Sequence, residues 1–378
     1  MNQKKKILFI MTALNGGGAE KVLVALLQNF DYTHFDVELL LTQIDGVHQS
    51  KLPQNIKVKT IYASKFLRRI LLYIYRKLGN VYLIKRRLHR LCSEDYDTIV
   101  SFMEGEALLH HALIVNKSSN NVTWVHTNLK MHHWTKWLFY QNDEEKCYNM
   151  MQQIIFVSHD AKKQFGAWYA LSPQIHQSVI NNFVDTKTIL KLSKEQAKIK
   201  KRKFTICTLA RLSPPKALDR LILATKLLKC KGYNIDVWIL GSGRLYDTLK
   251  NMILENDLED VVHLLGFFSN PYSIVKQADL FVCTSNVEGF SIAISEALIL
   301  GLPVVSTNIK GVNELLCNGE YGLLTEENVD DIANKLEFLI TNENMRTEYA
   351  KKSIVRAEQL FQIQKQLDNY YSILNKKN

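Results

Sequence analysis

Short apolar segments alternate with segments of helical period along the whole chain. Each apolar segment is hydrophobic throughout rather than at every second position. Strands have this character when helices cover both faces of a parallel sheet. The predicted strands are 7–12, 37–41, 58–61, 98–101, 122–125 and 154–158 in the first half, and 204–210, 236–240, 261–265, 280–284 and 303–306 in the second. The pattern therefore predicts two α/β arrays.

A lysine-rich stretch over residues 191–203 separates the arrays, and we interpret it as a helical linker region. We place a first domain at 1–182 and a second at 183–360. A helical pattern over 344–375 ends the chain, and we expect residues 361–378 to cross back to the first domain. Ligands of such sheets bind at the carboxyl ends of the strands, so we expect a site in a cleft between the halves.

Composition agrees with two folded domains. A chain of 378 residues is long for one domain, and its hydrophobic fraction of 47% and charged fraction of 22% are ordinary for a folded protein. No apolar stretch reaches the roughly 18 residues that cross a bilayer, and the basic start lacks a cleavage site, so we expect a cytoplasmic protein. The six cysteines show no C-x-x-C spacing, which predicts neither disulfides nor a zinc site.

The net charge of +11 is unevenly distributed, because no Asp or Glu occurs between Gly46 and Ser93. Basic and apolar residues alternate over 65–90 and predict one or two amphipathic helices with a break at 79–80. Such helices are either ordinary surface helices with an apolar core face, or a surface for anionic lipid or another polyanion. Nucleic acid is not expected, since no recognised nucleic-acid-binding signature accompanies the charge.

The segment 284–298 carries the richest chemistry. A strand ends near Thr284, a glycine loop follows, and a helix begins near Ser291, where backbone N–H groups and the helix dipole favour a phosphate. Glu288 precedes this helix and Glu296 lies one to two turns inside it. The two carboxylates would then reach different depths of one pocket, as a sugar hydroxyl and a ribose diol do. Alternatively, Glu288 caps the helix and Glu296 is a surface residue.

The spacing of these glutamates resembles the E-x7-E motif of glycosyltransferase family four. Matching segments follow in the family's order at 261–267, 278–282, 301–307, 311–315 and 319–324. The resemblance implies the GT-B fold, in which two Rossmann-like βαβ domains face a central cleft, and a retaining sugar transfer. It also implies that Glu288 holds the transferred sugar and that Glu296 binds the ribose of the donor.

Two cations stand on a proline-bearing loop after the strand 204–210. Arg211 and Lys216 would neutralise a departing diphosphate, or else are plain surface charges. The resemblance places both against the donor phosphates, although Ala217 stands where the family usually has Gly or Asn. It extends the donor site to the segment before and at the start of the helix, Gly289, Phe290, Ser291 and Ile292. It also adds Gly241, which ends another strand, where small residues let the backbone approach a ligand or simply make a turn.

The first half offers weaker candidates. Gly16 and Gly17 precede a helix, but the third spaced glycine of a dinucleotide fingerprint is missing, and a plain turn is the alternative. The resemblance places this loop beside the donor phosphate and acceptor. It also implies that His126, at the end of a strand, contacts the transferred sugar, although a lone histidine is often structural. The D-x-D at 95–97 reads as a turn, so we expect no metal.

The expected function is a retaining transfer without cofactor or metal, with catalytic roles for Glu288, His126, Arg211 and Lys216. We expect a nucleotide-sugar as the donor, with a UDP-sugar as the first choice. The acceptor is a glycan, expected on a polyprenyl diphosphate at the inner membrane face, in surface polysaccharide assembly. We assign acceptor or membrane contacts to four arginines of the basic segment: Arg68, Arg69, Arg86 and Arg87.

Three other functions fit parts of the pattern. A dinucleotide-dependent oxidoreductase is disfavoured by the missing G-x-G-x-x-G pattern. A transferase of the sucrose or sugar-phosphate synthase type, with a soluble acceptor, would share the same catalytic half. A noncatalytic protein that binds membranes or polyanions would have no use for the paired glutamates.

Overall fold

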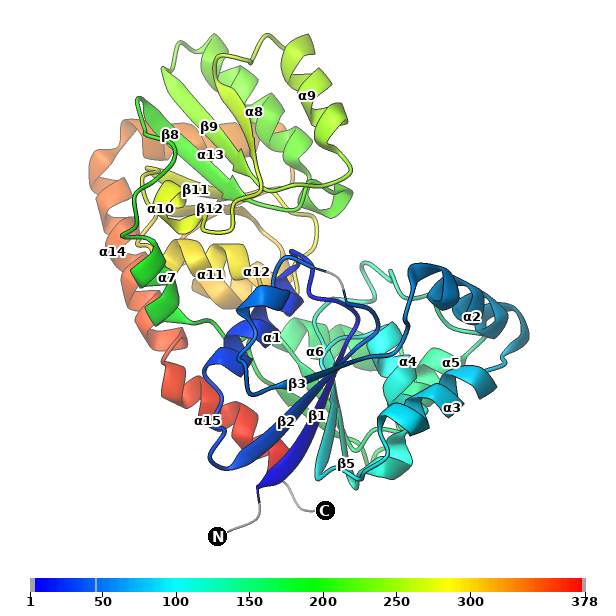
Figure 1. The fold of residues 1–378 in the computed structure, drawn as a ribbon. Coiled ribbons are helices and arrows are strands. Elements are labelled where there is room, and N and C mark those ends of the chain that lie inside the picture. The colour runs from blue at the N-terminus through cyan, green and yellow to red at the C-terminus, as the bar shows by residue number, and fades with distance from the viewer. Residues whose placement is uncertain (1–3, 45, 376–378) are drawn as a thin grey trace. The chain divides into compact units, whose positions relative to one another are not determined.

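The computed structural model describes residues 4–44 and 46–375, which form two compact units (Figure 1). Unit 1 extends to Phe183 and also takes in the chain from Gln364, whereas unit 2 is Val184–Ile363. In each unit a sheet of parallel strands packs between helices. The predicted α/β fold with two Rossmann-like domains is thus confirmed.

Unit 1 contains a seven-stranded sheet with the order β3-β2-β1-β4-β5-β6-β7. Its strands are β1 (Lys5–Met11), β2 (Phe35–Leu41), β3 (Lys57–Thr60), β4 (Thr98–Ser101), β5 (Asn120–Val125), β6 (Gln153–Phe156) and β7 (His176–Val179). Its helices are α1 (Gly18–Gln28), α2 (Lys65–Leu78), α3 (Tyr82–Leu91), α4 (Glu106–Ala112), α5 (Asp143–Asn149), α6 (His159–Gly166) and α15 (Ile363–Leu374). Short 3₁₀ turns are η1 (Gln49–Lys51) and η2 (Val115–Lys117).

Unit 2 contains a six-stranded sheet with the order β10-β9-β8-β11-β12-β13. Its strands are β8 (Phe204–Leu209), β9 (Ile235–Leu240), β10 (Val262–Gly266), β11 (Leu280–Cys283), β12 (Val304–Thr307) and β13 (Leu323–Thr325). Its helices are α7 (Thr186–Leu192), α8 (Leu218–Cys230), α9 (Tyr246–Glu255), α10 (Tyr272–Val275), α11 (Ile292–Ile299), α12 (Lys310–Leu316), α13 (Val329–Thr341) and α14 (Glu343–Leu360), with 3₁₀ turns η3 (Pro214–Lys216) and η4 (Cys317–Gly319).

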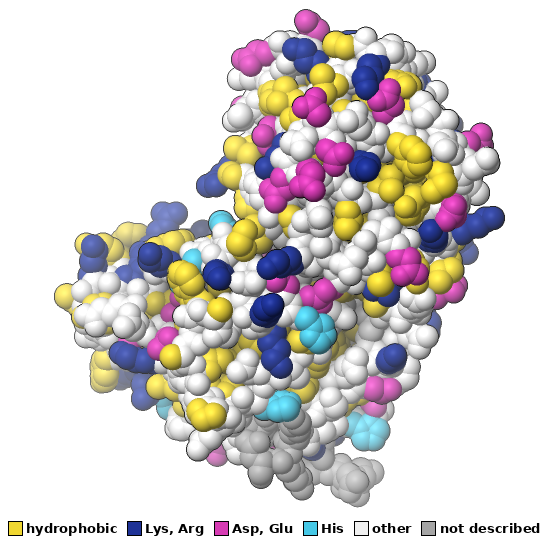
Figure 2. All heavy atoms as spheres, turned by 180° about the vertical axis from the view of Figure 1, so that it is seen from behind, with side chains coloured by type: hydrophobic (Ala, Val, Ile, Leu, Met, Phe, Trp, Pro, Cys, Tyr) yellow, Lys and Arg dark blue, Asp and Glu magenta, His cyan; other side chains and the backbone are white. Residues whose placement is uncertain are grey.

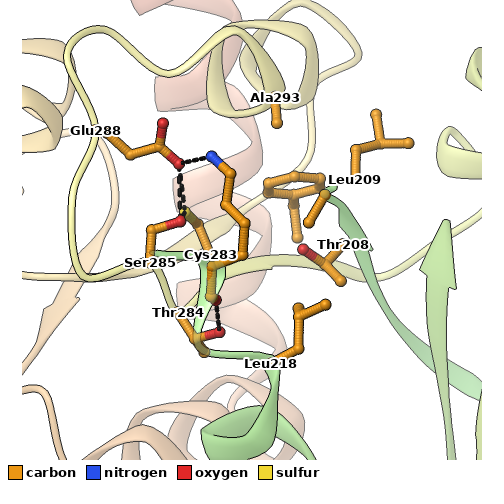
Figure 3. A pocket seen from close by; sticks show the side chains of 11 residues that line it. Thr208, Leu209, Leu218, Cys283, Thr284, Ser285, Glu288 and Ala293 are labelled. Carbon is orange, nitrogen blue, oxygen red and sulfur yellow. Dashed lines mark hydrogen bonds and ion pairs between the residues drawn. The ribbon is translucent and has the colours of Figure 1, made fainter. Parts of the chain in front are cut away.

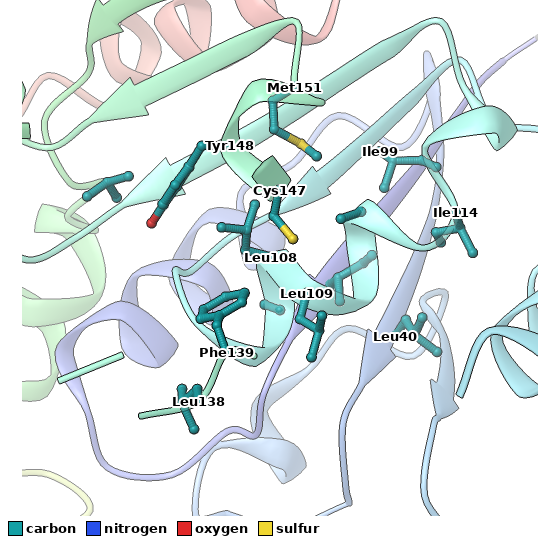
Figure 4. Close-up of a cluster of buried hydrophobic side chains, with 14 of the residues drawn as sticks. Leu40, Ile99, Leu108, Leu109, Ile114, Leu138, Phe139, Cys147, Tyr148 and Met151 are labelled. Carbon is teal, nitrogen blue, oxygen red and sulfur yellow. The ribbon is translucent and has the colours of Figure 1, made fainter. Parts of the chain in front are cut away.

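Apolar side chains of the central strands fill both cores. The side chains of β4 and β11 are buried along their whole length, because each of these strands lies inside its sheet and is covered by helices. In unit 1, Leu108 and Leu109 of α4 gather with Phe139 and with Cys147 of α5 in one cluster (Figure 4).

The last helix, α15, packs against the sheet of unit 1. The ring of Tyr370 stacks on Trp124 with 5.4 Å between centroids, and its hydroxyl accepts the backbone N–H of Phe183 at 3.2 Å. Tyr371 lies 5.2 Å from the rings of Phe30 and Phe35. These stacked aromatic contacts bury large apolar areas and join the end of the chain to the core of unit 1.

Several helices and strands differ from the sequence-based expectation. The expected helix over 191–203 is wrong, because α7 ends at Leu192 and no helix follows before β8. The pattern over 344–375 forms two helices that break at Phe361, whose ring packs on Phe290. The basic segment forms two helices, and Gly79 ends the first in the left-handed conformation at φ 67°, which glycine adopts at little cost. Strands β7 and β13 were not predicted.

Candidate functional site

The candidate site of unit 2 lies where two neighbouring strands, β8 and β11, reach their carboxyl ends. Backbone and side-chain hydrogen bonds join the two loops that follow these strands. The N–H of Asn286 donates to the carbonyl of Pro215 at 2.8 Å, and the Thr284 hydroxyl points at the carbonyls of Lys216 and Ala217 at 3.1 and 3.0 Å. The residues between 209 and 217 and between 284 and 291 therefore form one rigid rim.

An ion pair occupies this rim (Figure 3). The ammonium of Lys216 lies 2.5 Å from Glu288 Oε1, and the Ser285 hydroxyl donates to the same oxygen at 2.8 Å. Burial lowers the pKa of Lys216, but the attraction of Glu288 outweighs burial, so the pKa is raised overall. The site thus keeps a lysine charged in a largely buried pocket.

Arg211 adds a second cation at the end of β8. Its side chain is exposed, and its charge opposes the protonation of Lys216. The structure therefore pairs Lys216 with Glu288, while Arg211 follows β8 on the same loop as Lys216.

Both simple alternatives for the paired glutamates are excluded. Ser291, and not Glu288, caps α11, because its hydroxyl accepts the N–H of Ile294 at 3.5 Å. Glu296 lies inside α11 and only 3% of its surface is exposed, so it is not a surface residue. Its Oε1 accepts a hydrogen bond from the Tyr272 hydroxyl at 3.0 Å. Tyr272 gave no signal in the sequence, because it lies 24 positions before its partner.

The remaining predicted donor residues frame the same region. The ring of Phe290 is buried against Phe361, with 6.4 Å between centroids, so only its backbone remains for a ligand. Ile292 is partly exposed in the first turn of α11. Gly241, at φ +141°, lies so close to the chain after β8 that an added Cβ would be 1.9 Å from the Ala210 carbonyl oxygen.

Close backbone packing also supports the loop that carries Glu288 and Gly289. A Cβ on Gly311 of α12 would lie 2.2 Å from the Glu288 carbonyl oxygen and 2.5 Å from that of Gly289. Only glycine allows this approach. On the other side of the rim, Ala217 adopts the left-handed conformation at φ 42°, which explains why a residue such as Gly or Asn would suit this position better.

In unit 1, the predicted His126 lies at the end of β5 in a polar network that the sequence did not reveal. The carboxylate of Glu104, fully buried, accepts the backbone N–H of His126 at 3.0 Å, the Trp134 indole N–H at 3.2 Å and the Thr127 hydroxyl. Burial lowers the pKa of His126, against the attraction of Glu104. The His126 ring packs 5.2 Å from that of Phe102.

The other predictions for unit 1 concern a glycine loop and a D-x-D. Gly16 is exposed and Gly17 is partly exposed just before α1. Asp97 accepts the Lys6 backbone N–H at 2.8 Å, and Asp95 pairs with Lys117 at 3.2 Å, so both belong to a structural turn. Within residues 4–44 and 46–375, no group of three or more His, Cys, Asp or Glu side chains is arranged to hold a metal.

The four arginines of the basic segment divide into two kinds. Arg68 Nε donates to Glu106 Oε2 at 2.9 Å, and Arg87 Nε donates to the Ile61 carbonyl, so both are engaged within unit 1. Arg69 and Arg86 are exposed. The sequence does not show the two internal acceptors, and the acceptor or membrane contacts of the four arginines stay predictions.

The exposed side of α2 and α3 is both basic and apolar. We call it the α2–α3 surface, and Figure 2 shows hydrophobic and basic side chains gathered over this lobe. Its large apolar side chains include Phe66, Leu78 and Tyr82, each at least 65% exposed. Its exposed cations are Lys65, Arg69, Lys77, Lys85, Arg86 and Arg90. Among the described helices, none is both long and apolar enough to cross a membrane.

Two family models match successive parts of the chain. "Glycosyltransferase Family 4" matches residues 16–188, which lie almost entirely in unit 1, and "Glycosyl transferases group 1" matches residues 191–356 of unit 2. Together the two matches leave out only the ends of the chain and residues 189–190. Both models describe glycosyltransferase families.

Curated relatives agree with these models. N-acetylgalactosamine-N,N'-diacetylbacillosaminyl-diphospho-undecaprenol 4-alpha-N-acetylgalactosaminyltransferase of Campylobacter jejuni is 33% identical over 50% of this chain and 51% of its own length. CapM of Staphylococcus aureus, a capsular polysaccharide biosynthesis glycosyltransferase, is 30% identical over 48% of this chain and 49% of its own length. The chain thus spans about half the length of these relatives.

A solved structure matches the chain from end to end. HepE of Anabaena, crystallised with UDP and glucose, has a TM-score of 0.77 at 22% identity and covers 99% of this chain and 100% of its own. This likeness confirms the GT-B fold.

Proposed function

We propose that this chain, whose two halves each match a glycosyltransferase family, transfers a sugar from a nucleotide-sugar to a glycan acceptor. The observation that carries the proposal is the rim of unit 2. Lys216 and Glu288 pair at the ends of two adjacent strands, with Arg211 on the same loop as Lys216 and the buried Glu296 in the helix that follows Glu288. Two cations suit the diphosphate of a nucleotide-sugar. Two carboxylates at different depths suit the hydroxyl groups of the ribose and of the sugar on either side of it.

In this proposal the donor lies along the rim. The diphosphate is stabilised by Lys216, Arg211 and the amino end of α11, Glu296 accepts the ribose hydroxyls, and Glu288 accepts hydroxyls of the transferred sugar. Binding then exchanges one partner of Lys216, because the phosphate competes with Glu288 for the ammonium. HepE, which was solved with UDP and glucose, makes a UDP-sugar the first donor to test.

We further propose that the reaction retains the anomeric configuration and needs no metal. The bond between the sugar carbon and the diphosphate breaks while the acceptor oxygen bonds to that carbon from the same face. The acceptor proton passes to the departing phosphate oxygen, whose growing charge is stabilised by Lys216 and Arg211. The predicted contacts of His126, Gly16 and Gly17 with the donor stay predictions.

We propose a glycan on a polyprenyl diphosphate as the acceptor, in surface polysaccharide assembly at the cytoplasmic face of the membrane. The Campylobacter relative is named for a diphospho-undecaprenol acceptor, and CapM for capsule biosynthesis. The α2–α3 surface supports this proposal, because its exposed cations and apolar side chains suit an anionic lipid surface.

A donor panel tests the enzymatic proposal. The protein is incubated with UDP-, GDP- and ADP-sugars and a lipid-linked glycan in EDTA, and product is measured with its anomeric configuration. We expect one donor to be used with retention and Glu296→Ala to weaken its binding. Absence of turnover and binding with every donor would contradict the proposal, and loss of turnover in EDTA would contradict metal independence.

Vesicle sedimentation tests the membrane proposal. Arg69→Gln with Arg86→Gln should lower recovery on vesicles of phosphatidylglycerol and phosphatidylcholine by several fold, since each cation near an anionic surface contributes about 1 kcal/mol. Binding of UDP should not change. The matched variant Lys226→Gln with Lys250→Gln removes two cations from unit 2 and should sediment like the wild type. Equal recovery of all three proteins would contradict a membrane role of the α2–α3 surface.

A further inference from the structure

Glu296 is held by an aromatic side chain from a separate helix. Tyr272 opens α10, is 5% exposed, and donates its hydroxyl to Glu296 Oε1 at 3.0 Å. Glu296 itself is 3% exposed and lies in the middle of α11. A carboxylate that is buried this deeply requires hydrogen-bond donors to offset the loss of water.

A small framework fixes Tyr272 in turn. The Tyr272 backbone N–H donates to Asn270 Oδ1 at 3.1 Å. The Asn270 side-chain amide donates to the Leu192 carbonyl at 2.9 Å and to Glu195 Oε2 at 2.8 Å, just after α7. The phenol that donates to Glu296 is therefore anchored outside α11. The position of the Glu296 carboxylate depends both on α11, which carries it, and on the loop and helix that hold Tyr272.

The two glutamates of the motif differ in the donor that holds them. Glu288 Oε1 meets an ammonium, which offsets its charge, whereas Glu296 Oε1 meets a neutral phenol. A donor that is held in place by its own framework fixes the orientation of the carboxylate that accepts from it, as the Tyr272 phenol does for Glu296. An oriented carboxylate can accept hydrogen bonds from adjacent hydroxyls at a defined angle.

We propose that Tyr272 is a positioning residue that orients Glu296 toward the two ribose hydroxyls of the donor. The proposal rests on the proposed function, in which Glu296 binds that ribose. Tyr272 sets how strongly the protein distinguishes a ribonucleotide from one that lacks the 2′ and 3′ hydroxyls. A tyrosine that only supports the fold would affect both nucleotides alike.

Calorimetric titration with UDP and with 2′,3′-dideoxy-UDP tests this role. The wild type should bind UDP more tightly than the dideoxy analogue. Tyr272→Phe should weaken UDP binding about tenfold, as expected for a lost hydrogen bond to a charged group, and should change dideoxy-UDP binding less than twofold. When Glu296→Gln is already present, adding Tyr272→Phe should weaken UDP binding little further, because the phenol acts through the carboxylate.

A second tyrosine of unit 2 provides the matched control. Tyr233 donates its hydroxyl to Glu337 Oε1 at 2.8 Å, away from the rim, so Tyr233→Phe removes the same type of bond and should alter neither affinity. Equal weakening of both nucleotides by Tyr272→Phe, or no weakening, would overturn the positioning role alone. A wild type that does not prefer UDP over its dideoxy analogue would overturn the ribose site, and the positioning role with it.

Discussion

Strands β4 and β11 occupy equivalent places in the two sheets, and each is followed by a carboxylate that is stabilised in a different way. After β4, Glu104 accepts hydrogen bonds from neutral donors of its own unit. After β11, Glu288 faces the ammonium of Lys216. Three donors from the chain itself converge on Glu104, which suits a residue that supports the fold. An ammonium can exchange its carboxylate for a ligand anion, which suits a binding site.

The largest expected difference between the two units is the loss of stability of unit 1 in acid. Burial lowers the pKa of His110 to about 3 and of His111 to about 4, and both lie in unit 1. The unfolded chain takes up these protons near pH 6.5 and the folded unit does not, so stability falls as pH drops from 6.5 toward 4. At pH 5 the two histidines should together cost about 4 kcal/mol.

Hydrogen exchange at pH 7.5 and pH 5, corrected for intrinsic rates, measures this difference. Unit 2 contains one histidine, the partly exposed His263. Peptides of β4 and β5 should therefore lose protection in acid before peptides of β8 and β11. Equal loss of protection in the two units would contradict the assignment.

Removal of Glu104 should affect stability and leave the donor site intact. Glu104→Ala removes the acceptor of the His126 backbone N–H and the Thr127 hydroxyl and leaves the Trp134 indole with Thr127 alone, which should cost roughly 2 to 3 kcal/mol in urea unfolding. The surface variant Glu94→Ala should leave the urea midpoint nearly unchanged, because it breaks only an exposed pair with Lys6. UDP affinity should stay unchanged in both. Weaker UDP binding by Glu104→Ala would mean that the network is part of the donor site.

Gly311→Ala should affect turnover more than stability. The added methyl group collides with the carbonyl oxygens of Glu288 and Gly289 and must displace the loop. A shift of about 1 Å there should lower turnover roughly 100-fold. Gly166→Ala is the matched control, since its Cβ meets no atom within 4 Å at the end of α6, and it should keep full activity. Normal turnover by Gly311→Ala would show that the position of the Glu288 loop does not matter.

The smallest expected effect concerns the strained residue beside Lys216. Ala217→Gly removes the cost of the left-handed conformation and should raise the free energy of unfolding by about 0.5 to 1 kcal/mol. Gly232→Ala is the reverse change at φ +85° with open space around it, and should lower stability by about 1 kcal/mol. Thermal unfolding compares the two. A destabilised Ala217→Gly would mean that the alanine methyl group packs favourably on the rim.

The sequence predicted the parts of the fold that depend on local pattern. Strand β4 has the bounds expected from its apolar run, and the glycine break between α2 and α3 falls at residue 79. Strand β7, His-Gln-Ser-Val, was missed because an edge strand needs few apolar residues. The break at Phe361 was missed, and the ring of Phe361 there contacts Phe290, which is distant in sequence and so leaves no mark in the local pattern.

The same distinction holds for the site. Arg211, Lys216 and Glu288 were candidates because each follows a recognisable strand, and Glu296 because its spacing from Glu288 resembles the E-x7-E motif. Tyr272 and Glu104 were not found, because their roles depend on hydrogen bonds between segments 22 or more positions apart. Sequence spacing also could not show that Arg68 pairs with Glu106 whereas its neighbour Arg69 is exposed.

Calorimetric titration of UDP against Lys216→Met and Glu288→Gln tests most directly whether Lys216 exchanges Glu288 for the donor diphosphate. Lys216→Met should weaken UDP binding at least about tenfold, because a charged contact to phosphate is lost. Glu288→Gln should bind UDP as tightly as the wild type or more tightly, since the competing carboxylate is gone. Wild-type affinity in Lys216→Met, or an equal loss in both variants, would contradict the account.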